Sequence, residues 1–150
     1  MYSIEELDSL KTKILKYVLY KKRTEKEIRQ KFCDTDEDML EDAICYLKEA
    51  GYINDSDYIE RSMREFMALK NLSLKEVNYK LYAKGISRKS IEDYMAEHGE
   101  ELVDYEIQSA KNIMCKKDGK MEWEEIEAYL HKKGYLEETI HIAQKEYRGE

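Results

Sequence analysis

The sequence contains no proline, only six glycines and only three cysteines. Without proline and with little glycine, helices can continue uninterrupted, and the abundant Glu, Lys, Leu and Ile favour them. The three cysteines, Cys33, Cys45 and Cys115, show no CxxC spacing, which argues against a disulfide framework and predicts small buried side chains in a reducing compartment. Since 150 residues suffice to bury a core, the sequence predicts one all-α domain that needs no metal.

Long apolar runs are also missing. No stretch approaches the roughly 20 apolar residues that a membrane-spanning helix requires. The first ten residues carry Glu5, Glu6 and Asp8 instead of a basic and then apolar segment, so they do not resemble a secretory signal. We therefore expect a cytoplasmic protein.

Motifs that carry out catalysis are lacking as well. The sequence has no glycine-rich phosphate loop and no G-x-S-x-G motif. His98, His131 and His141 have no carboxylate or cysteine at metal-ligand spacing. We expect neither an enzyme nor a cofactor or metal site, and binding becomes the default expectation.

What the sequence does contain is an internal repeat. Glu27-Ile28 recurs as Glu76-Val77 and again as Glu125-Ile126, at intervals of 49 residues. Later in the unit, Lys84-Gly85 recurs at the same interval as Lys133-Gly134. A repeat of this length is typical of stacked supersecondary units, each of which buries its apolar face against its neighbours.

Helix boundaries can be placed within each unit. Thr24-x-x-Glu27 and Ser73-x-x-Glu76 are capping boxes that start helices, and Asp36, Asp55 and Ser87 suit the N-cap position. Glycines after amphipathic runs predict helix ends at Gly51, Gly85 and Gly134. The predicted helices are 8–22, 25–33, 37–50, 56–70, 74–84, 88–98, 102–117, 123–132 and 137–148. They predict three tandem three-helix repeats, at about 8–50, 55–98 and 102–148, forming an elongated, curved body.

Charge follows the repeat. The net charge is −7, but it conceals blocks of opposite sign. Residues 11–33 hold nine basic and two acidic side chains, and residues 34–60 hold one and ten. Residues 61–90 hold eight and two, and residues 91–110 hold none and seven, whereas 111–150 is nearly balanced. After stacking, such blocks predict basic and acidic stripes on different faces.

The order of short motifs resembles one known family. Gly51-Tyr52-Ile53-Asn54-Asp55, then Tyr58, Arg61 and Arg64, then Leu81 and Lys84-Gly85-Ile86, are similar to the central stretch of RecX proteins. Arg23-Thr24-x-x-Glu27-Ile28 and Lys133-Gly134-Tyr135 resemble that family's opening and closing segments. The resemblance implies a modulator that binds the RecA filament on single-stranded DNA and inhibits filament growth, ATP hydrolysis and strand exchange.

Three features depart from the family pattern. Phe66 stands where many members continue an arginine-rich helix, the glycine that often follows is replaced around Asn71-Leu72, and the net charge is acidic. These departures weigh against direct DNA contact more than against RecA contact, so we expect only weak binding to single-stranded DNA. A helical-repeat adaptor for an unrelated protein and a direct nucleic-acid binder stay open as alternatives.

Candidate partner-binding residues come from the basic blocks. Arg61 and Arg64 lie one helical turn apart, so two guanidinium groups could meet acidic side chains or phosphates together. The candidates in the central unit are Tyr58, Arg61, Arg64, Lys70, Lys75, Lys80, Lys84, Arg88 and Lys89. A second group, expected between the first two helices, is Lys21, Lys22, Arg23 and Lys26.

Overall fold

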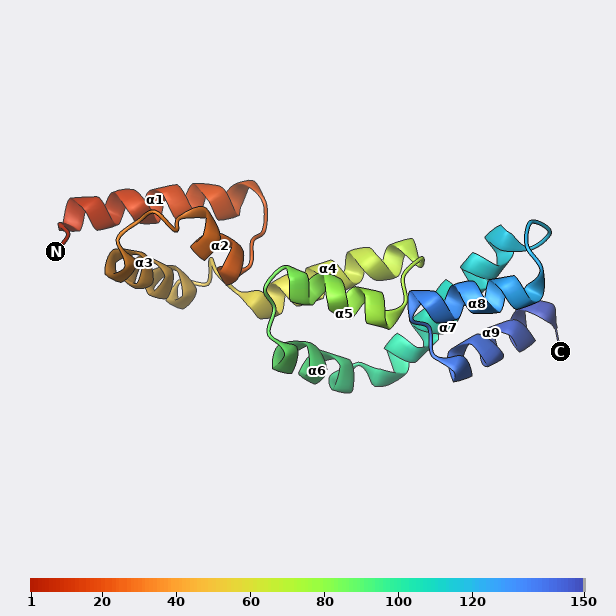
Figure 1. Cartoon of the computed structure of the whole chain (residues 1–150). Coiled ribbons are helices and arrows are strands. Elements are labelled where there is room, and N and C mark those ends of the chain that lie inside the picture. Colours follow the sequence, from red (N-terminus) through yellow and green to blue (C-terminus); the bar gives the residue numbers. More distant parts are fainter. Residues whose placement is uncertain (150) are drawn as a thin grey trace.

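The computed structural model describes residues 1–149, and every regular element in that range is an α-helix. The elements are α1 (Ile4–Tyr20), α2 (Glu25–Lys31), α3 (Glu37–Glu49), α4 (Asp55–Leu69), α5 (Leu74–Ala83), α6 (Arg88–Glu97), α7 (Gly99–Lys117), α8 (Trp123–Lys133) and α9 (Glu137–Arg148). Figure 1 shows them as three groups in a row, with the two ends of the chain at opposite ends of the molecule. The predicted all-α architecture is confirmed, and the three groups in a row are compatible with the predicted elongated array of three-helix repeats.

The apolar core is divided in the same way. Buried side chains gather in three clusters, carried mainly by α1 to α3, by α4 to α6 and by α7 to α9. Ile28, Val77 and Ile126, the repeated positions, are fully buried, and each belongs to a different cluster. Equivalent residues therefore hold equivalent places. The boundaries of the three repeats stay a prediction, which these clusters support.

Most helices begin where the capping pattern predicts. Thr24 with Glu27 and Ser73 with Glu76 form both bonds of a capping box. The first helix begins at Ile4 rather than at residue 8, because Ser3 and Glu6 form a further capping box. Asn54, and not Asp55, caps α4.

The joint between neighbouring units is built twice from equivalent residues. The hydroxyl of Thr24 donates to the carbonyl oxygen of Lys84, and the hydroxyl of Ser73 donates to that of Lys133 at 2.8 Å. Both hydroxyl-bearing residues are completely buried. The two bonds join positions 60 residues apart in each case, so α2 is fixed to the end of α5 as α5 is fixed to the end of α8.

Glycine is required at both joints. Gly85 has φ +101° and Gly134 has φ +100°, a left-handed conformation that strains other residues. The side chains of Lys26 and Lys75 fill the space beside these glycines, and a Cβ at Gly134 would lie 2.9 Å from Cβ of Lys75. The repeated Lys-Gly pair is thus a packing feature as well as a helix end.

A buried carboxylate completes the second joint. Glu106 of α7, only 2% exposed, accepts hydrogen bonds from the backbone N–H of Leu74 at 3.0 Å and of Leu136 at 3.2 Å. Leu74 is the first residue of α5, so its N–H has no partner within that helix. At the first joint the carboxylate of Asp55 accepts from the N–H of Glu25 at 3.1 Å, and burial raises the pKa of Asp55.

One expectation about side chains is wrong. Cys33, Cys45 and Cys115 are exposed rather than buried, because each lies on a helix or turn surface that faces away from its cluster. Among the tyrosines, Tyr79 at 73% and Tyr82 at 57% are largely exposed, whereas Tyr17 and Tyr129 pack against the edge of the core. Within the described residues, no helix is both long and apolar enough to cross a membrane.

Candidate functional site

Arg61 and Arg64 lie on the surface of α4. Both side chains are exposed, and neither forms an ion pair within 4.0 Å in the described part of the chain. Their charges still act locally, because Lys22, with smaller effects of Arg61 and Arg64, holds the pKa of the Asp57 carboxyl below its usual value. The two guanidinium groups are therefore free to meet a partner.

The structure brings the two groups of candidates together at this point. Nζ of Lys22, which follows α1, lies 2.8 Å from Oδ2 of Asp57 on α4. Asp57 is one turn before Arg61 on the same helix. A basic segment that the sequence separates by about 40 residues thus adjoins the α4 arginines. We call Lys22, Arg61 and Arg64 the α4 patch.

Other candidates are engaged within the molecule. The guanidinium of Arg23 lies 4.2 Å from the ring centroid of Tyr17, a cation–π contact, and its Nε is buried without a hydrogen-bond partner. Tyr58 is half-buried against the second cluster, and burial raises its pKa. Arg23 is therefore engaged with α1, and Tyr58 with the core beneath α4, so neither side chain is fully available to a partner.

Three lysines belong to the joints. The aliphatic parts of Lys26 and Lys75 pack beside Gly85 and Gly134. Nζ of Lys84 lies 3.8 Å from Oε2 of Glu27, so this lysine spans the first joint. Their charged ends are exposed, but the stems have a structural role that charge counting along the sequence does not reveal.

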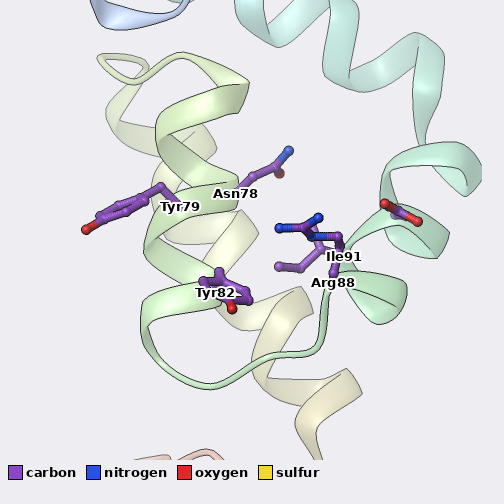
Figure 2. A pocket seen from close by; sticks show the side chains of 6 residues that line it. Asn78, Tyr79, Tyr82, Arg88 and Ile91 are labelled. Carbon is purple, nitrogen blue, oxygen red and sulfur yellow. The ribbon is translucent and has the colours of Figure 1, made fainter.

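The remaining candidates are exposed, four of them in the central unit and one, Lys21, at the end of α1. They are Lys21, Lys70, Lys80, Arg88 and Lys89. Lys70 ends α4 in a left-handed conformation with φ 49°. Arg88 lines a cavity of about 400 Å³ between α5 and α6. Figure 2 shows Asn78, Arg88 and Ile91 pointing toward one another in this cavity, whereas Tyr79 points away.

One basic cavity was not predicted. It lies between the α4–α5 connection and helices α7 and α8, and four lysines contribute to its lining. Lys116, Lys117 and Lys120 fall in the stretch whose total charge is nearly balanced, so block counting does not reveal them. The local run Lys116-Lys117-Asp118-Gly119-Lys120 was the available signal. Within the described residues, no group of three or more His, Cys, Asp or Glu is placed to hold a metal.

Comparison with known proteins gives a consistent result. No model of a known protein family matches the sequence. The chain is 31% identical over 134 residues to "Regulatory protein RecX" of Staphylococcus carnosus, covering 86% of this chain and 50% of that protein. It is 29% identical over 155 residues to the protein of the same name from Staphylococcus epidermidis, covering 97% of this chain and 58% of that protein. The chain spans about half the length of these relatives.

Solved structures share the fold. The crystal structure of RecX from Lactobacillus salivarius superimposes with a TM-score of 0.82 at 22% identity, covering 99% of this chain and 100% of that chain. A crystal structure of a regulatory protein RecX gives a TM-score of 0.80 at 20% identity, covering 93% and 73%. From the relatives in sequence together with this shared fold, we conclude that the chain belongs to the RecX family.

Proposed function

We propose that the chain is a non-catalytic regulator that binds the RecA filament and inhibits its recombinase and ATPase activities. The names of the relatives, all regulatory proteins RecX, support a regulatory role. RecA as the partner follows from the family resemblance of the sequence. Because the chain spans about half of these relatives, their whole activity is not carried over by similarity alone.

The shape supports a polymeric partner. Three helical groups in a row (Figure 1) present a long surface that many protomers of a filament can contact at once. Five cavities on the described part of the chain are open to solvent, and the lining of each includes charged side chains. An elongated body with an exposed basic patch is suited to binding a large partner.

The α4 patch is the proposed contact with the partner. The observation that carries this proposal is that the guanidinium groups of Arg61 and Arg64 form no ion pair within the described residues. Arg61 and Arg64 are exposed one turn apart on the helix. Each can form a bidentate bond with a carboxylate or phosphate of the partner. The exposed ends of Lys80, Arg88 and Lys89 extend the basic surface of the central unit.

A RecA ATPase assay on single-stranded DNA tests the proposal. The double substitution Arg61→Glu and Arg64→Glu should lower the inhibitory potency at least tenfold. Reversing a charge that pairs with the partner across an interface costs several kcal/mol of binding free energy. The circular dichroism spectrum should stay unchanged, since both side chains are exposed.

The chain offers a matched control. Lys13 and Lys16 are also exposed and one turn apart, on α1. Lys13→Glu with Lys16→Glu makes the same charge change and should keep the inhibition. Full inhibition by the α4 double variant would reject the α4 patch, and absence of any effect of the unmodified chain on RecA would leave the adaptor alternative. The proposed role places the protein in the cytoplasm.

A further inference from the structure

A cavity of about 520 Å³ lies at the second joint, beside the connection from α4 to α5. Its volume falls within the range of about 300–1,000 Å³ that is usual for ligand sites. The lining residues are Asn71, Leu72, Ile113, Lys116, Lys117, Lys120, Met121, Tyr129 and Lys133. We call this cavity the lysine cleft.

Its charge sets it apart from the other cavities. The lining contains four lysines and, among the described residues, no carboxylate. Four further cavities at the surface each contain at least one Asp or Glu side chain. The protein has a net charge of −7, whereas the lining of the lysine cleft is positively charged.

Three of its lysines have no acidic partner. In the described part of the chain, Lys116, Lys117 and Lys120 form no ion pair within 4.0 Å. The nearest acidic residue along the chain, Asp118, instead accepts a hydrogen bond from the hydroxyl of Tyr147 at 3.0 Å. Lys133 lies 3.8 Å from Glu76 and 3.3 Å from the carbonyl oxygen of Asn71, and Nζ of Lys117 lies 4.9 Å from the ring centroid of Tyr129, a cation–π contact.

The uncharged lining has its own chemistry. Leu72, Ile113 and Met121 provide an apolar floor, and Tyr129 adds an aromatic ring. Asn71 also lines the cleft, and its Oδ1 is buried without a hydrogen-bond partner, so an occupant that reaches this oxygen has to supply a donor. An occupant should therefore combine an anion, a flat apolar group and N–H donors.

A nucleotide unit supplies all three. Its phosphate suits the lysines, its base suits the floor and the ring, and the N–H groups of the base suit Asn71. An acidic peptide side chain supplies the anion without the aromatic group. In a duplex the bases are stacked and paired, whereas a single strand can present one to a cleft of this size.

We propose that the lysine cleft binds a nucleotide unit of a single-stranded nucleic acid directly, without a second protein. This goes beyond the proposed regulation of a filament, because it concerns a bare strand and a different surface from the α4 patch. The lysine cleft is then the site of the weak binding to single-stranded DNA that the sequence leads us to expect. With a net negative protein, binding is weak and steeply dependent on salt.

The test is fluorescence anisotropy of a labelled 20-nucleotide single strand, with no RecA present, between 50 and 200 mM salt. Lys116→Gln with Lys120→Gln removes two phosphate contacts, so affinity at 50 mM salt should fall about tenfold and the salt slope should decrease by about 1.4. Neither lysine contributes to a buried cluster, and Lys116→Arg with Lys120→Arg should bind like the unmodified chain.

Two controls make the same change in net charge elsewhere. Lys13→Gln with Lys16→Gln and Arg61→Gln with Arg64→Gln should each stay within twofold of the unmodified chain. An equal loss in the first control would show a general effect of charge, and an equal loss in the second would assign strand binding to the α4 patch. Either result overturns the proposal.

Two competitors identify the source of the ligand. A free nucleotide, AMP, should compete only at millimolar concentration, because it offers one unit instead of a strand. A polyglutamate peptide of matched charge should compete at least tenfold less well than the unlabelled strand, and equal competition would overturn the nucleic-acid assignment. Trp123 is the only tryptophan and lies two residues from Met121, so its fluorescence should be quenched by the strand and unchanged in the Lys116→Gln, Lys120→Gln variant.

Discussion

At the scale of single residues, the glycines of the Lys-Gly pairs show how one position can have two structural roles. Gly85 ends a helix with a positive φ, and at the same time its missing Cβ leaves room for the stem of Lys26. The sequence predicts the first of these roles from the position of glycine after an amphipathic run. The second depends on a residue 59 positions away, so no local pattern reveals it.

Substitution of Gly85 by alanine separates the two roles. Left-handed strain costs about 1–2 kcal/mol, and the overlap with Cβ of Lys26 adds about 1–2 kcal/mol because that atom cannot move without its backbone. Gly51→Ala is the control, since φ is +85° there but nothing lies within 4 Å of the added Cβ. Urea unfolding followed by circular dichroism should show the larger loss for Gly85→Ala. Equal losses would mean that the contact with Lys26 contributes nothing.

At the scale of elements, capping patterns predict most helix boundaries well because they are local. Thr24 and Glu27 are three residues apart and complete their capping box without help from the rest of the chain. The predicted start of the first helix at residue 8 is wrong because Ser3 and Glu6 form a capping box one turn earlier in the chain. What local patterns do not reveal is that the hydroxyl of Thr24 also bonds to the end of α5.

The same limit applies to the candidate site. Counting charges along the chain correctly placed Arg61 and Arg64 in an exposed basic stretch. It could not show that Lys22 adjoins α4 through Asp57, since the residues are distant in sequence. It also concealed the lysine cleft, because acidic residues on the outer faces of α8 and α9 cancel Lys116 and Lys120 in the sum.

Replacing Thr24 by valine should affect both the helix and the joint. Loss of the cap costs about 1 kcal/mol, and the carbonyl of Lys84, left without its donor at this partly buried bond, costs about 1 kcal/mol more. Ser3→Ala removes a cap of the same kind at an exposed helix start without a joint bond, so about 1 kcal/mol is expected. Urea midpoints measure both. A loss for Thr24→Val no larger than for Ser3→Ala would contradict the role of the joint bond.

At the scale of the whole molecule, stability is distributed along a row of units. Each unit carries most of its own apolar cluster, and neighbouring units are bonded to one another at the joints, as in repeat proteins. A weakened joint should therefore free the unit beyond it more than the unit at the far end. Hydrogen exchange resolves this difference, because each helix reports on its own opening.

Glu106→Ala makes the prediction specific. The backbone N–H groups of Leu74 and Leu136 both lose their acceptor, at a cost of about 2–5 kcal/mol in total. Amide exchange should accelerate in α8 and α9 while α1 and α3 stay protected. Asp55→Ala, which weakens the first joint, should instead accelerate exchange in α1 to α3. Uniform acceleration over all helices in both variants would show a single cooperative unit instead of a row.

The equivalence of the two joints has a consequence for how such a molecule can change in size. Lys84 and Lys133 contribute equivalent backbone carbonyl groups, and Thr24 and Ser73 contribute equivalent side-chain hydroxyl groups. Excising or inserting 49 residues between matching positions would therefore leave every surviving connection complete. The length of the protein can then be increased or decreased in fixed increments of one unit, with the same two kinds of joint residue used each time.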